Sequence, residues 1–190
     1  LKKKKIDNAI IEASSHGLHQ ERLHHIDFKS AVFTNFSQDH LDYHKNMKAY
    51  LNAKLILFRK ILRKKTKIIS DKDILPFKIL KKISKKRGLK LVDINNEFLK
   101  VKNQLPAFPD FKKKNLAMAI SVAKICGLKE HLIYRKIKKI KDVNGRLELV
   151  KKFPNKVKVF LDYAHTPDAL LKTLEYLKNE NKKNISIILG

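Results

Sequence analysis

The stretch VKVFLDYAHTPDAL, residues 157–170, decides the fold class. An apolar run over 157–161 predicts a short strand, a polar loop follows, and Pro167 stands where a helix begins. We expect that helix over 167–178 and another strand over 185–189. A strand, a crossover helix and a second strand form a βαβ unit with a parallel sheet. The sequence therefore predicts an α/β protein.

The alternation of strands and helices continues toward the start of the chain. Gly145, between Asn144 and Arg146, marks a boundary, and we predict one domain over 1–143 and the beginning of a second over 144–190. Because the chain begins without Met and ends on a strand, we expect it to be cut at both ends. Further strands are predicted over 8–13, 30–34, 67–70, 147–151 and, as a pair around a turn at 95–96, within 89–101; further helices over 18–25, 47–62, 74–87, 115–126 and 130–140.

Composition limits the classes of protein that remain. The 190 residues are 43% hydrophobic, which is enough for a core and argues against a wholly disordered chain. No apolar run approaches the roughly 18 residues that a membrane-spanning helix needs. A single cysteine, Cys126, can form no internal disulfide and is typical of a protein from the reducing cytoplasm.

The formal net charge of +26 would suit a protein that binds nucleic acid. The basic residues, however, are 38 lysines and only six arginines, spread along the whole chain. Proteins that read bases and phosphates favour arginine for its forked donors. We therefore favour a solvated basic surface and keep a basic nucleic-acid-binding module as the alternative. The glycines form neither a phosphate loop nor a dinucleotide fingerprint.

Polar side chains gather just after predicted strands. Glu12 lies at the end of the first, His40 follows the second, and Asp162 and His165 follow the strand over 157–161. In open parallel sheets, ligands bind in the crevice at the carboxyl ends of the strands. The pattern favours a ligand site built from these loops.

Five ordered motifs resemble a known family, the Mur ligases. Similarity extends from about residue 8 to 190, with a poor match near 65–105. The likeness is strongest to the branch that adds the third residue of the cell-wall peptide. It implies the later part of a P-loop-type central ATP-binding domain, followed by a Rossmann-like C-terminal domain. The motifs are EASSHGL over 12–18 with Arg22 nearby, FTNFSQDHLDYH over 33–44, AK over 53–54, GRLE over 145–148 and DYAHTPDAL over 162–170.

This resemblance implies an ATP-dependent amide-forming reaction in peptidoglycan precursor synthesis. ATP phosphorylates the terminal carboxylate of UDP-MurNAc-L-Ala-D-Glu, and the amine of an amino acid, expected to be meso-diaminopimelate, attacks the acyl phosphate. A lysine-adding ligase or a folylpolyglutamate-type ligase is the alternative. The family's phosphate loop would lie before residue 1 and its amino-acid-selecting motif after residue 190, so we expect this fragment alone to be inactive. We also expect a cytoplasmic monomer without nucleic acid or a membrane span.

The resemblance further implies a magnesium ion and the residues that hold it. Glu12 and His40 match metal ligands, and Lys54 matches a lysine that carbon dioxide converts to a carbamate. Such a lysine must lose its proton readily, which partial burial favours. The alternatives are a surface carboxylate at 12, a structural imidazole at 40 and an ordinary helical lysine at 54.

Other matched positions suggest substrate contacts. Ser14 and Arg22 resemble groups that hold the nucleotide-linked substrate, with a helix cap and a surface ion pair as their alternatives. His16 is interpreted as structural, and Asp168 as part of the opening turn of the helix after it. Asn115, at the expected start of a helix, resembles an adenine contact or is simply a helix cap. Catalysis is implied for Lys54, His40 and Arg146, and ATP binding for Asn115, Arg146, Asp162 and His165.

Overall fold

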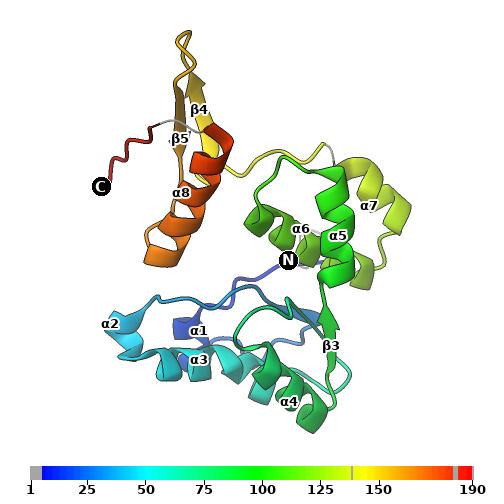
Figure 1. Ribbon diagram of the computed structural model, residues 1–190. Coiled ribbons are helices and arrows are strands. Elements are labelled where there is room, and N and C mark those ends of the chain that lie inside the picture. Colours follow the sequence, from blue (N-terminus) through cyan, green and yellow to red (C-terminus); the bar gives the residue numbers. More distant parts are fainter. Residues whose placement is uncertain (1–5, 138, 182–183, 190) are drawn as a thin grey trace. The chain divides into compact units, whose positions relative to one another are not determined.

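The computed structural model describes residues 6–137, 139–181 and 184–189 (Figure 1). Two compact units make up the chain. The first comprises residues 1–36 and 40–93, and the second comprises residues 37–39 and 94–190. The domain boundary at residues 143 and 144 stays a prediction. None of the helices in the described ranges is long and apolar enough to cross a membrane.

The first unit is built on a parallel three-stranded sheet in the order β1-β2-β3. Its strands are β1 (Ser30–Phe33), β2 (Lys67–Ser70) and β3 (Lys90–Asp93). Ile68 of β2 aligns with Ala31 on one side and Leu91 on the other. The connections carry α2 (Leu41–His44), α3 (Met47–Ile56), the π-helical turn η2 (Leu57–Ile61) and α4 (Phe77–Arg87), and α1 (Ser15–His19) precedes the sheet. This arrangement confirms the α/β class.

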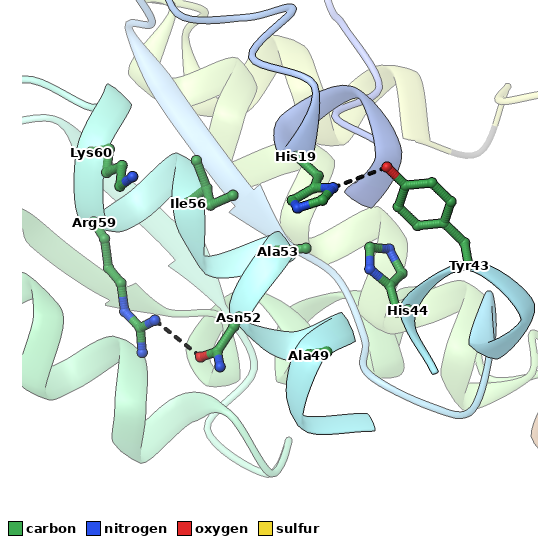
Figure 2. A pocket seen from close by; sticks show the side chains of 9 residues that line it. All are labelled: His19, Tyr43, His44, Ala49, Asn52, Ala53, Ile56, Arg59 and Lys60. Atoms are coloured by element: carbon green, nitrogen blue, oxygen red, sulfur yellow. Dashed lines mark hydrogen bonds between the residues drawn. The ribbon is translucent and has the colours of Figure 1, made fainter. Parts of the chain in front are cut away.

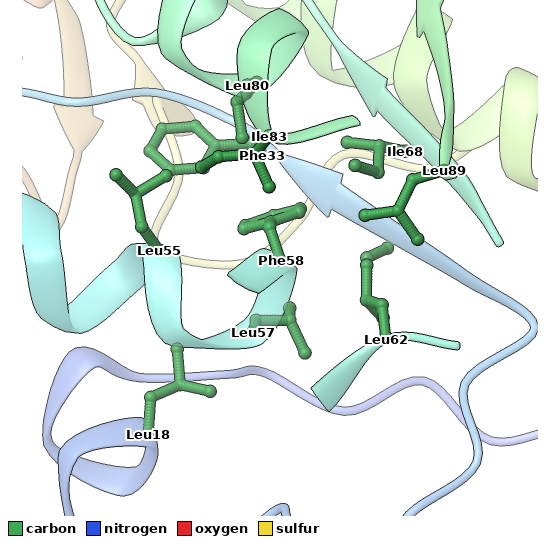
Figure 3. Close-up of a cluster of buried hydrophobic side chains, with 11 residues drawn as sticks. Leu18, Phe33, Leu55, Leu57, Phe58, Leu62, Ile68, Leu80, Ile83 and Leu89 are labelled. Atoms are coloured by element: carbon green, nitrogen blue, oxygen red, sulfur yellow. The ribbon is translucent and has the colours of Figure 1, made fainter. Parts of the chain in front are cut away.

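One hydrophobic cluster fixes the helices of the first unit to its sheet (Figure 3). Phe58 of η2 lies 5.8 Å from the ring of Phe33 on β1, measured between ring centroids. Leu80 and Ile83 of α4 and Ile68 of β2 belong to the same cluster, so α3, η2 and α4 share one core. Burial of such side chains contributes about 1.5–3 kcal/mol each.

The second unit contains a group of helices followed by a β-hairpin and a final helix. The helices are α5 (Asn95–Gln104), α6 (Asp110–Ile125) and α7 (Glu130–Ile137). Strands β4 (Glu148–Lys152) and β5 (Lys158–Leu161) pair antiparallel, with an irregularity between Leu149 and Lys151. Helix α8 (Pro167–Asn181) follows.

Two of the predicted strands at the chain's flanks are wrong. Residues 8–13 form no strand, and the side chain of Ile10 is 96% exposed. Residues 185–189 are likewise irregular and exposed, and β5 therefore pairs with β4 in a hairpin instead of completing a βαβ unit. Both stretches carry the apolar residues of a buried strand. A strand needs a partner for its backbone groups, however, and neither stretch is paired among the described residues.

Three other expectations fail locally. The predicted second strand after the turn at 95–96 is helix α5 instead, and Val101 forms part of its buried side. The helix predicted over 18–25 begins earlier and ends at His19, because Ser14 caps it and Glu21 adopts a left-handed conformation with φ 60°. Helix α6 begins at Asp110, well before the expected start at 115.

Candidate functional site

His40 and Lys54 come from adjoining elements of the first unit. His40 stands at the N-terminal end of α2 in a left-handed conformation, with φ 53° and ψ 30°. Asn46 then caps α3, its Oδ1 accepting a hydrogen bond from the backbone N–H of Ala49 at 2.9 Å. Lys54 lies on α3 between the buried residues Ala53 and Leu55 and is itself half-buried. The cap thus sets where Lys54 falls relative to the loop that carries His40.

The buried ring of Tyr50 brings these two predicted residues into one neighbourhood. Tyr50 precedes Lys54 by one helical turn, and the Lys54 Nζ lies 4.9 Å from the centroid of its ring. The imidazole of His40 packs edge-on against the same ring at 5.9 Å between centroids. Phe36 stacks on it at 5.3 Å. Tyr50 is only 4% exposed, so it is a fixed platform between the amine and the imidazole.

Sequence reasoning missed Tyr50. Its signal is the spacing of four residues from Lys54, which places both side chains on one face of a helix.

A ring network joins α1 to the loop and helix that contain His40. The His16 ring lies 4.9 Å from the ring of His40, 4.1 Å from that of Tyr43 and 5.4 Å from that of His44. His44 is buried, and its Nε2 shares a hydrogen bond of 2.9 Å with the Ser15 hydroxyl. These contacts agree with the structural role predicted for His16.

Burial, together with the neighbouring charges of His16, His19 and His40, lowers the pKa of His44. The cluster therefore favours a neutral imidazole at its centre.

Ser14 and Arg22 occupy the two ends of the first helical segment. The Ser14 hydroxyl accepts a hydrogen bond from the backbone N–H of Gly17 at 3.1 Å, which is the capping alternative. Arg22 is exposed, and its backbone N–H donates to the carbonyl of Gly17 at 2.9 Å. Neither geometry tests a substrate contact, so the substrate roles stay predictions.

Among the described residues, no contact between Glu12 and the other two predicted magnesium ligands is found, so its role as a ligand stays a prediction. Glu12 is exposed in the irregular stretch before α1, and within the described ranges no hydrogen bond or ion pair to it is found. Nor do the described residues contain a group of three His, Cys, Asp or Glu side chains that could hold a metal ion. The donors fit a magnesium site in part only, through the neighbouring His40 and Lys54.

Three predicted ATP-binding residues meet in the second unit, at the loop after β5. The Asp162 carboxylate accepts hydrogen bonds from the backbone N–H groups of Leu147 at 2.5 Å and Ala164 at 2.7 Å. It thereby ties this loop to the turn before β4. The Arg146 guanidinium consequently lies 4.8 Å from the centroid of the Tyr163 ring. His165 packs edge-on against that ring at 5.1 Å.

The remaining predicted positions are helical. Asn115 is exposed inside α6 and not at its start, so the alternative of a helix cap is wrong. Its adenine contact stays a prediction. Asp168 lies in the first turn of α8, as expected, and its carboxylate accepts a hydrogen bond from Lys172 at 2.7 Å.

Residues 1–124 match the family model described as the Mur ligase middle domain, and residues 145–190 match the one described as the Mur ligase, glutamate ligase domain. Three similar curated proteins are all named UDP-N-acetylmuramoyl-L-alanyl-D-glutamate--2,6-diaminopimelate ligase.

The three relatives differ little in their similarity to the chain. The protein from Wigglesworthia glossinidia brevipalpis is 36% identical over 99% of the chain, and that from Rickettsia bellii is 37% identical over 100%. The protein from Aquifex aeolicus is 35% identical over 96% of the chain. The chain spans between 41% and 44% of the length of these relatives.

Proposed function

The chain belongs to the Mur ligase family, and from this premise we propose that it works within an ATP-dependent ligase of peptidoglycan precursor synthesis. The ligase joins meso-diaminopimelate to UDP-MurNAc-L-Ala-D-Glu through an acyl phosphate. The observation that carries this proposal is the match of nearly the whole chain to relatives named for that reaction. Relatives with that name favour diaminopimelate over lysine as the added amino acid.

The chemistry requires two anions, ATP and a carboxylate, to approach each other while charge develops on the transferred phosphoryl group. Cationic groups that are already held in position stabilise this developing charge without having to rearrange during the reaction. In the second unit, Arg146 is such a group, because Asp162 fixes the turn that carries it. We assign Arg146 to the ATP phosphates, and Asp162, His165 and Asn115 to the nucleoside.

Lys54 is the residue on which the first unit's role depends. It is half-buried on α3 between Ala53 and Leu55, and we propose that carbon dioxide converts this amine to a carbamate. The ring of Tyr50 beneath it limits the directions that the modified side chain can take. A carbamate and the His40 imidazole beside the same ring supply two metal donors, and Glu12 is proposed as a third. Magnesium bound there would neutralise phosphate charge.

Ser14 and Arg22 are proposed to hold the peptide end of the substrate. Arg22 can bind a carboxylate through two parallel hydrogen bonds. The Ser14 hydroxyl still has its proton to donate, because in the helix cap it acts only as an acceptor.

The test uses the natural protein that contains residues 1–190. It is supplied with ATP, magnesium and UDP-MurNAc-L-Ala-D-Glu, together with either meso-diaminopimelate or L-lysine. We expect a tripeptide product and phosphate release with diaminopimelate. Product with lysine alone would overturn the choice of amino acid, and no product with either would overturn the reaction.

A separate readout addresses Lys54. Protein equilibrated with ¹³C-bicarbonate should show a carbamate signal in its ¹³C spectrum, and Lys54→Gln should abolish that signal. Lys48→Gln, which removes an exposed lysine from the same helix, is the matched control and should leave it unchanged. A signal that persists in Lys54→Gln would exclude this lysine as the modified residue.

A further inference from the structure

A cavity of about 520 Å³ lies against α3 in the first unit, and its residues have no role in the proposed ligase reaction (Figure 2). Its lining comes from α1, α2, α3 and η2, which all belong to one compact unit. None of Glu12, Ser14, Arg22, His40 and Lys54 lines it. The volume falls within the range of small-molecule sites.

The floor of the cavity is apolar. Ala49, Ala53 and Ile56 follow one another at intervals of four and three residues, which places them on one face of α3. Ala53 is only 4% exposed. The two alanines leave room above the helix that larger side chains would fill. A ligand resting on this floor must therefore present an apolar surface.

One wall of the cavity is aromatic. His19 and Tyr43 stand beside the floor, and a hydrogen bond of 2.9 Å between His19 Nδ1 and the Tyr43 hydroxyl fixes the pair (Figure 2). Their rings pack edge-on at 5.7 Å between centroids. The wall offers ring surface for an aromatic group of a ligand to pack against.

The opposite wall carries two cations from the π-helical turn η2. Leu62 donates its backbone N–H to the carbonyl of Leu57 at 3.0 Å, five residues back, which is the pairing that defines a π turn. Leu57 and Phe58 enter the core, whereas Arg59 and Lys60 are exposed and line the cavity. No carboxylate is among the lining residues, so neither charge is neutralised from within the cavity.

The guanidinium of Arg59 is already oriented for binding. Its Nη1 donates to the Asn52 Oδ1 at 3.1 Å, one of the five N–H donors that the side chain offers. The chain contains only six arginines beside 38 lysines, and this one stands in a cavity wall. Lys60 is the second cation of this wall, and two cations suit a doubly charged phosphate better than a singly charged carboxylate.

From this arrangement we infer a second binding site on the first unit, for a small phosphate monoester with an aromatic group. The phosphate lies between Arg59 and Lys60, and the aromatic group rests on the alanine floor beside His19 and Tyr43. The inference does not depend on the ligase reaction. Its residues lie outside the proposed substrate and metal positions, and its test measures binding and not turnover.

The test is calorimetric titration of the purified chain with phenyl phosphate as the probe. Phenol and inorganic phosphate, each carrying one half of the probe, are titrated in parallel. We expect phenyl phosphate to bind about tenfold more tightly than either half. No detectable binding of phenyl phosphate, or equally tight binding of inorganic phosphate, would overturn the inference.

Variants locate the site. Arg59→Gln with Lys60→Gln should weaken phenyl phosphate binding about tenfold or more. Lys85→Gln with Lys86→Gln removes the same charge from exposed positions of α4 and should leave binding unchanged. Equal weakening by both pairs would show general attraction to a basic protein and overturn the site. Ala49→Leu fills the floor and should weaken phenyl phosphate binding but not that of inorganic phosphate, provided that circular dichroism shows it folded.

Discussion

At the scale of single residues, Glu97 is the acid that binds two lysines and a tyrosine of the second unit. Its Oε1 accepts a hydrogen bond from Lys124 at 2.6 Å, and its Oε2 accepts one from the Tyr134 hydroxyl at 2.6 Å. Burial acts to raise the pKa of Glu97, but these hydrogen bonds and the charges of Lys124 and Lys100 outweigh it, and the pKa is lowered. One carboxylate thus links α5, α6 and α7.

We predict that Glu97→Gln destabilises the chain by about 1–3 kcal/mol, because it leaves Lys124 partly buried with a weaker acceptor. The measurement is urea unfolding at neutral pH. Glu130→Gln is the matched control, since the side chain of Glu130 is 49% exposed against 15% for Glu97. Its effect should be clearly smaller. Equal losses of unfolding free energy in the two variants would contradict the argument that burial makes the Glu97 contacts more stabilising.

His44 makes the stability of the chain depend on pH, because its imidazole takes up a proton less readily in the folded state than in the unfolded state. Its pKa is lowered in the folded chain by burial and by three neighbouring imidazoles, whereas the unfolded chain keeps the ordinary value of 6.5. Below pH 6.5 the unfolded state therefore binds more protons, and stability falls as the pH falls. We predict that His44→Gln, which can still bond to Ser15, flattens the decline in unfolding free energy measured by urea between about pH 7.5 and 5.5. His25→Gln, an exposed histidine, should keep the decline unchanged.

At the scale of elements, the local sequence pattern correctly predicted helices and strands whose hydrophobic partners lie in the described part of the chain. The strand over 67–70 was predicted with its bounds, because β2 is the central strand and its apolar run is buried between two neighbours. The stretch over 8–13 has an equally apolar pattern but lies exposed. Part of helix α5 was predicted as a strand, because its apolar residues over 98–101 fit the residue spacing of a strand as well as that of a helix. What decides such cases is pairing and packing, which a local pattern does not contain.

Helix α4 ends at Arg87, and Gly88 follows as its C-terminal cap, where the backbone is left-handed with φ 65°. The Gly88 N–H donates to the carbonyl of Ser84, as does that of Leu89 at 2.9 Å. A Cβ at this position would meet only the Lys64 Cγ, at 3.7 Å, so the cost of a side chain is conformational and not steric. We predict that Gly88→Ala lowers the unfolding free energy by about 1 kcal/mol. Gly88→Asn should cost less, because asparagine tolerates this conformation, and an equal loss would contradict the argument.

At the scale of the whole molecule, the sequence motifs identified the family but only part of the site's geometry. The loop after β5 holds Arg146, Asp162 and His165 together, because Asp162 bridges residues distant in sequence. His40 and Lys54 both contact the ring of Tyr50, a residue that the motif comparison did not single out as part of the site. Motifs preserve the residues that do chemistry, whereas the packing that positions them depends on neighbours of many possible types. The cavity beside η2 was not predicted for the same reason.

The net charge of +26 predicts how the whole chain responds to salt. With 44 basic and 18 acidic residues, repulsion between like charges is stronger in the compact state than in the expanded one. Salt screens this repulsion, since the Debye length falls from about 30 Å at 0.01 M to about 10 Å at 0.1 M. The short ion pairs around Glu97 are partly buried and are screened much less. We therefore predict that the unfolding free energy, measured with uncharged urea, rises with sodium chloride over this range. Potassium chloride at equal ionic strength should act alike, and a fall in stability would mean that attractive pairs outweigh the net repulsion.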